Sequence, residues 1–93
     1  MQGQEIQSVI ERIRQMERCY NEVLRALEVN ANEMHQNSAI SKMIQELTAY
    51  MDSGLWLQDY ECDERGELPS DLQRGVLSED GLYNLLITVH TSV

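Results

Sequence analysis

The residues best suited to chemistry in this 93-residue chain are carboxylates that alternate along one acidic run. Asp59, Glu61 and Asp63 stand two positions apart, and oxygen ligands of this kind are what Ca²⁺ and Mg²⁺ prefer. An EF-hand loop that begins at Asp59 requires Gly where Glu64 stands and a bidentate Glu where Ser70 stands. The calcium-loop motif is therefore excluded, and Asp59, Glu61 and Asp63 remain candidate ligands for a divalent cation held in another geometry.

Two aromatic residues, Trp56 and Tyr60, stand beside this acidic run. Aromatic side chains often anchor protein interfaces, and neighbouring carboxylates favour a basic partner. Trp56, Tyr60, Asp59 and Glu61 are therefore candidate partner-binding residues. Two simpler interpretations stay open: the run is a solvated acidic loop, and Trp56 fills the core over the first helix.

The cysteines and histidines form no catalytic or zinc-binding pattern. Neither Cys19 nor Cys62 lies at zinc-ligand spacing from His35 or His90. Negative neighbours disfavour the thiolate form of Cys62, so we do not expect it to act as a nucleophile. The sequence also has no Gly-rich phosphate loop, nucleophile elbow or HExxH motif. It predicts no catalytic residue and no cofactor, and it favours a role other than an enzyme.

The charge balance bears on the class of partner and on the compartment. The chain has 16 acidic and 7 basic residues, a formal net charge of −9. Nucleic-acid binding and docking on anionic membranes both depend on Lys and Arg, so we expect neither. The first residues lack the basic and apolar regions of a signal peptide, and no apolar run approaches membrane-spanning length. We therefore expect a soluble cytoplasmic protein with reduced thiols.

Helical periodicity is clearest over residues 5–28. Apolar side chains recur there at spacings of three and four and form one narrow seam, made by Ile6, Val9, Ile10, Ile13, Met16, Tyr20, Val23, Leu24 and Leu27. A second helix is expected over residues 33–53, ended by Gly54. The sequence leaves the start of this helix open between several caps. Asn30 and Glu33 together resemble a capping pair, and Asn37 or Ser38 is equally suitable as a cap.

A short connection makes these two helices antiparallel neighbours. The first helix is the longer of the two, so its apolar residues from Ile6 to Ile13 project beyond its partner. We expect the C-terminal third of the chain, or a second copy, to cover them. That third is expected to hold an acidic loop over residues 58–77 and a buried helix over residues 78–90, capped by Ser78. The predicted fold is a single all-α domain over residues 1–93, a helical hairpin with a third helix packed on it.

Two blocks of the C-terminal half resemble a known family. Residues 53–61, with Trp56 and Asp59, and residues 75–83 resemble a family of small bacterial proteins known as a domain of unknown function, number 4298. The resemblance implies a bacterial origin and a helical pair followed by this tail. It implies no activity, cofactor or catalytic residue.

Three functional hypotheses remain. The first is a protein-interaction or regulatory module that binds an unidentified protein, of basic charge or a second copy of the chain as a homodimer. The second is a cation-dependent protein or small enzyme that uses carboxylates within residues 59–67. The third is an acidic inhibitor of a basic protein.

Overall fold

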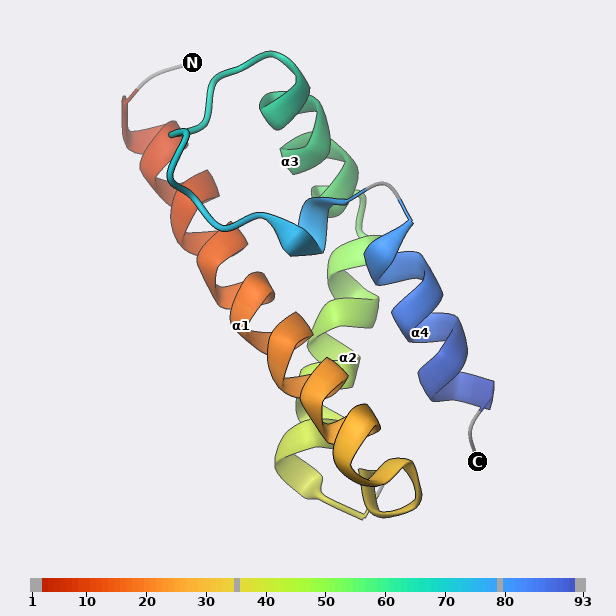
Figure 1. Cartoon of the computed structure of the whole chain (residues 1–93). Coiled ribbons are helices and arrows are strands. Elements are labelled where there is room, and N and C mark those ends of the chain that lie inside the picture. Colours follow the sequence, from red (N-terminus) through yellow and green to blue (C-terminus); the bar gives the residue numbers. More distant parts are fainter. Residues whose placement is uncertain (1–2, 35, 79, 92–93) are drawn as a thin grey trace.

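The computed structural model describes residues 3–34, 36–78 and 80–91, which form a bundle of α-helices. The helices are α1 (Gly3–Met34), α2 (Ser38–Asp52), α3 (Leu55–Glu64) and α4 (Gly81–Thr91), with a short 3-10 helix, η1 (Gly75–Leu77), before α4. Figure 1 shows α1 and α2 as an antiparallel pair, α3 beyond the end of α2, and α4 beside α2. The described residues include no strand. The predicted all-α bundle is therefore confirmed, with one helix more than expected.

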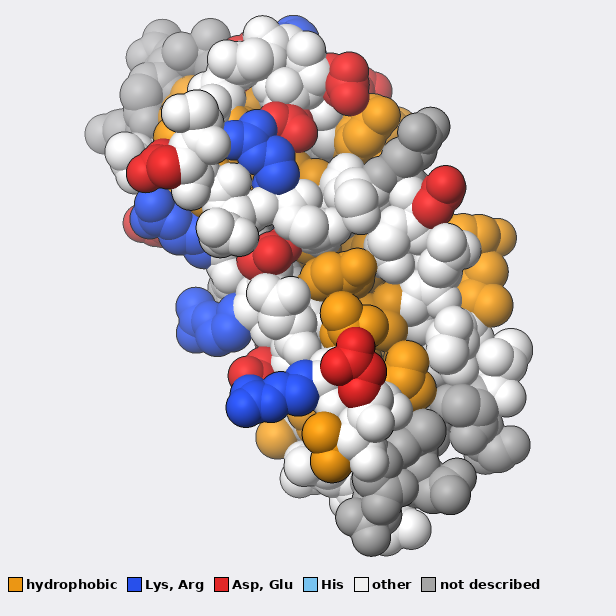
Figure 2. All heavy atoms as spheres, in the orientation of Figure 1, with side chains coloured by type: hydrophobic (Ala, Val, Ile, Leu, Met, Phe, Trp, Pro, Cys, Tyr) orange, Lys and Arg blue, Asp and Glu red, His pale blue; other side chains and the backbone are white. Residues whose placement is uncertain are grey.

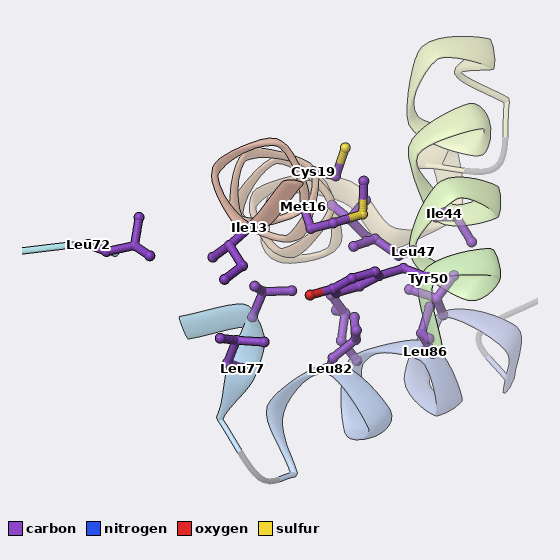
Figure 3. Packing of buried hydrophobic residues seen from close by; sticks show 14 of the residues in the cluster. Ile13, Met16, Cys19, Ile44, Leu47, Tyr50, Leu72, Leu77, Leu82 and Leu86 are labelled. Atoms are coloured by element: carbon purple, nitrogen blue, oxygen red, sulfur yellow. The ribbon is translucent and has the colours of Figure 1, made fainter. Parts of the chain in front are cut away.

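The hairpin that the seam predicts is formed by α1 and α2. Ile13 and Val23 on α1 and Leu47 on α2 have no exposed side-chain surface. Figure 3 shows side chains of α1, α2 and α4 converging on this core. The first helix continues to Met34, six residues beyond the predicted end, and the second begins at Ser38 and not at residue 33. Among the candidate caps Asn37 is the one used, because its side chain accepts hydrogen bonds from the amides of Ala39 (3.0 Å) and Ile40 (3.2 Å).

The second and third helices are separated by two residues, Ser53 and Gly54, of which Gly54 sets the turn. Its φ of +85° lies in the left-handed region, where glycine has no Cβ to clash, and this ends α2 as predicted. The chain then re-enters a helix at Leu55, so the loop expected from residue 58 is wrong for residues 58–64. After α3 ends at Glu64, the connection to η1 contains Gly66 and Pro69, which do not favour a continued helix.

The segment from residue 65 to η1 returns to the N-terminal half of α1 (Figure 1). Val9 and Ile10, which project beyond α2, are only 8% and 6% exposed. The returning segment contributes buried side chains to the same core, namely Leu68, Leu72, Val76 and Leu77. A hydrogen bond of 2.7 Å from the amide of Val76 to the carboxylate of Glu17 ties η1 to α1. The prediction that the C-terminal third covers the bare end of the first helix is thus confirmed.

The last helix begins later than predicted, at Gly81 and not at residue 78. Leu82, Leu85, Leu86 and Val89 are buried as expected. Tyr83 and Ile87 are not, since 59% and 45% of their surfaces remain exposed. The expectation of burial all round this helix is therefore wrong for one face. Glu79 and His35 lie outside the described residues.

Among the helices of the described residues, none combines the length and the apolar character that crossing a membrane requires.

Candidate functional site

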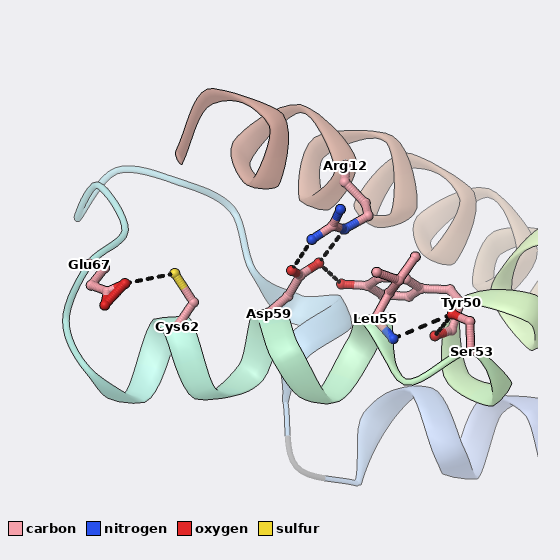
Figure 4. A network of polar contacts seen from close by, with 7 residues as sticks. All are labelled: Arg12, Tyr50, Ser53, Leu55, Asp59, Cys62 and Glu67. Carbon is pink, nitrogen blue, oxygen red and sulfur yellow. Dashed lines mark hydrogen bonds and ion pairs between the residues drawn. The ribbon is translucent and has the colours of Figure 1, made fainter. Parts of the chain in front are cut away.

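An ion pair between Arg12 and Asp59, with Tyr50 as a third partner, joins the helices α1, α2 and α3 (Figure 4). The carboxylate of Asp59 on α3 is 1% exposed and accepts two hydrogen bonds from the guanidinium of Arg12 on α1, one of them 2.8 Å from Nε. The hydroxyl of Tyr50 on α2 donates a third, at 2.6 Å. Burial raises the pKa of Tyr50 above its ordinary value, and the hydrogen bond to Asp59 raises it further. The same carboxylate, mainly through its hydrogen bonds, raises the pKa of Arg12.

This network gives Asp59 a structural role. A carboxylate out of water requires paired charge and hydrogen bonds, and Arg12 with Tyr50 supplies both. Asp59 therefore faces the interior, and its carboxylate is engaged by Arg12 and Tyr50 and is not presented at the surface. Its assignment to a partner surface is corrected for that reason.

The three candidate cation ligands do not converge. Asp59 is bound to Arg12, and Asp63 forms an ion pair with Arg74. Glu61 is exposed, and because two residues of α-helix turn the chain by about 200°, it points away from the other two. Within the described part of the chain, no three His, Cys, Asp or Glu side chains are placed to hold a metal ion.

The indole of Trp56 connects α3 to η1. Its Nε1 donates a 2.9 Å hydrogen bond to the carbonyl of Val76, and its ring stacks on Tyr60 with centroids 5.1 Å apart. Trp56 is half-buried and packs against the core, as the interpretation that it fills the core predicts. Leu57 on the outer side of α3 is 52% exposed, and Glu61 is exposed as well.

Both cysteines are buried and free, and each thiol faces a carboxylate. The Sγ of Cys19 lies 3.5 Å from Oε2 of Glu46, and the Sγ of Cys62 lies 3.5 Å from Oε2 of Glu67. Burial, with a smaller contribution from Glu46, raises the pKa of Cys19 to about 11. Burial also raises the pKa of Cys62. Both thiols therefore stay protonated near neutral pH, where a protonated thiol is a poor nucleophile.

An apolar groove between α2 and α4 is one of the surface hollows that the sequence analysis did not single out. It has a volume of ≈ 320 Å³ and is lined by Thr48, Met51, Asp52, Tyr83, Leu86, Ile87, His90 and Thr91. The exposed side chains of Tyr83 and Ile87, one helical turn apart, stand on the α4 side of it. Figure 2 shows hydrophobic side chains along the outer edge of α4.

Two features of the sequence point to these missed residues. Arg12 falls on the apolar seam of α1, between Val9 and Met16, and a charged residue in such a seam requires a buried partner. The segment 81–91 has no Asp, Glu, Lys or Arg, although a quarter of the chain is charged. Depletion of charged residues is typical of interface cores, so this composition is a signal from which a candidate binding surface could have been inferred.

Comparison with known proteins gives one match. The model of the family described as "Domain of unknown function (DUF4298)" matches residues 13–93, which confirms the resemblance noted in the sequence. No curated protein and no solved structure matches the chain.

Proposed function

Because the chain belongs to the DUF4298 family, whose description states no activity, we propose its function from its surface: it is a protein-interaction module that docks a polypeptide on the groove between α2 and α4. The proposal retains the interaction role expected from the sequence. It places the binding surface on α4 and not on the acidic face of α3.

The observation that carries this proposal is the exposure of Tyr83 and Ile87 beside an apolar hollow. Tyrosine offers a large contact area with few rotatable bonds, and it is enriched among the residues that dominate binding energy. Leu86 and Met51 also line the groove and supply apolar walls against which an inserted side chain loses its water.

The two alternative functions have less support. A cation-dependent role needs free carboxylates, and Asp59 and Asp63 are engaged by Arg12 and Arg74. An acidic inhibitor would use the outer face of α3, where Glu61 and Glu64 are exposed beside Leu57. That alternative is tested together with the main proposal by a variant of Leu57.

The experiment is quantitative affinity purification from the source cell with three tagged forms: wild type, Ile87→Lys and Leu57→Lys. The two substitutions introduce the same charge at similarly exposed positions, on α4 and α3 respectively. We expect wild type and Leu57→Lys to retain the same bound polypeptide and Ile87→Lys to lose it. Equal recovery with all three forms would contradict the proposal, and loss with Leu57→Lys alone would favour the acidic-inhibitor alternative.

A further inference from the structure

We propose that the polypeptide docked on the α2–α4 groove is a second copy of this chain, which forms a two-fold symmetric dimer through α4. The inference rests on the proposed function, since it names the occupant of the same groove. Three observations support it: the distribution of charge, the shape of the surface and its size.

The distribution of charge favours α4 as the face on which two copies meet. Two molecules with a net charge of −9 repel each other, so association requires a face without acidic side chains at its centre. The other three helices all carry Asp or Glu, whereas α4 has none and also lacks Lys and Arg. Its exposed positions carry apolar or uncharged polar side chains together with one histidine, namely Tyr83, Asn84, Ile87, Thr88, His90 and Thr91. Asp52 is the one carboxylate among the residues that line the groove, so a second acidic copy meets little like charge there and a basic partner finds a single counter-charge.

The shape of the surface is suited to self-association. In a two-fold interface the same patch serves both subunits, so it must present a projection and a hollow together. Here Tyr83 and Ile87 project beside the groove, and Met51 and Leu86 line it. An antiparallel pairing of the two α4 helices places Tyr83 of each copy against the groove of the other. It also keeps the two acidic ends apart. Asp52 is the last residue of α2 and Asp80 directly precedes α4, and Figure 1 shows that the end of α2 lies beside the start of α4.

The size of the surface sets the strength of the dimer. The α4 helix has 11 residues and is about 16 Å long, so the two copies bury a surface at the small end of specific interfaces. We therefore expect a weak dimer in equilibrium with monomer. Its dependence on salt has a definite sign, since salt screens the repulsion between two acidic molecules and strengthens their association.

The test is sedimentation equilibrium of the untagged protein at about 10 µM to about 1 mM, a range suited to small interfaces. It is repeated at about 0.05 M and about 0.5 M NaCl, between which the Debye length falls several-fold. Wild type is expected to pass from the 10.7 kDa monomer to twice that mass as concentration rises, with a larger dimer fraction at the higher salt. Ile87→Lys and Tyr83→Ser should remain monomeric, and Leu57→Lys should behave as wild type. The two lysine variants lower the net negative charge equally, so loss of the dimer in Ile87→Lys alone is not an effect of added repulsion.

Three outcomes overturn the inference. They are a monomer under every condition, a dimer that weakens as salt rises, and a dimer that survives both α4 substitutions while circular dichroism shows folded protein. A wild-type monomer combined with a different polypeptide lost from Ile87→Lys in the affinity purification would refute the dimer and leave the proposed function standing. A monomer with equal capture by all three tagged forms would refute both.

Discussion

Arg12 and Asp59 lie 47 residues apart in the chain and meet as a two-pronged ion pair, which fastens the first helix to the third. Tyr50 of the second helix completes the contact with its hydroxyl, so one carboxylate holds three helices in register. Trp56 and Asp59, which the sequence marks as candidate site residues, therefore act in the packing of α3. The binding surface that we propose lies on α4.

Removing the Asp59 carboxylate should be strongly destabilising. Asp59→Asn leaves the Arg12 charge partly buried without its partner, and we expect a loss of about 3 kcal/mol in the free energy of unfolding. Urea unfolding followed by fluorescence measures it. Arg12→Met combined with Asp59→Leu and Tyr50→Phe should recover most of that loss, because this apolar set leaves neither a buried charge nor an unpaired buried hydroxyl. A loss below about 1 kcal/mol in Asp59→Asn would place the pair among weak surface ion pairs and contradict its structural role.

Replacing the indole of Trp56 separates its hydrogen bond from its packing. Trp56→Phe keeps an aromatic ring near Tyr60 and removes the bond to the Val76 carbonyl, which should cost about 1 kcal/mol. Trp56→Ala also removes half-buried apolar surface, and we expect a total cost of about 2–3 kcal/mol. Thermal and urea unfolding of both variants give these values. Leu57→Ala on the exposed side of the same helix is the control and should change stability by less than about 0.5 kcal/mol.

The conformation of Gly54 predicts a cost for any side chain at that position. No atom lies within 4 Å of a Cβ built there, so the cost of Gly54→Ala comes from backbone strain alone. At a φ of +85° we expect the variant to lose about 1–2 kcal/mol of stability. Gly54→Asn should lose less, because Asn tolerates the left-handed region better than Ala does. Equal stability of wild type and Gly54→Ala would show that α2 and α3 join in some other conformation.

The raised pKa of Cys19 predicts a loss of stability in alkaline solution. The thiol ionises near pH 8.5 in the unfolded chain and near pH 11 in the folded one. The unfolded state therefore loses its proton first, and the contribution of Cys19 is complete below about pH 8 and declines as pH rises toward 11. The free energy of unfolding should fall over this window in wild type and fall less steeply in Cys19→Ala. Part of the pH dependence of the free energy of unfolding remains in that variant, because burial raises the pKa of Cys62 as well.

If the free energy of unfolding fell more steeply with pH in Cys19→Ala than in wild type, the raised pKa of Cys19 would be contradicted. The comparison is made between pH 8.5 and 10, since unfolded tyrosines ionise near pH 10 and add a separate contribution from Tyr50.

The sequence predicts those parts of the fold that depend on local spacing. The seam through Ile13 and Val23 places the buried side of α1, because apolar residues at spacings of three and four must share one face. Gly54 marks the end of α2, because only glycine adopts its backbone conformation at low cost. The need to cover residues 6–13 follows from the unequal lengths of the first two helices and predicts the return of the tail.

The parts that the sequence did not predict depend on contacts between distant residues. Residues 58–64 are dense in acids and were expected to form a loop, yet they are helical while Arg12 and Arg74 pair with Asp59 and Asp63. Spacing within one segment does not reveal such partners. Exposure of Tyr83 and Ile87 likewise depends on how far α2 and η1 wrap around α4, which the apolar pattern of residues 82–89 leaves undetermined.

The most direct measurement of the central claim is hydroxyl-radical footprinting of the chain, read by mass spectrometry residue by residue. The dilute isolated protein is compared with the assembled form recovered from source cells. If α4 is the binding surface, oxidation of Tyr83 and Ile87 falls several-fold on assembly while oxidation of Leu57 stays the same. Unchanged oxidation of Tyr83 with protection of Leu57 would contradict the account and place the interface on α3.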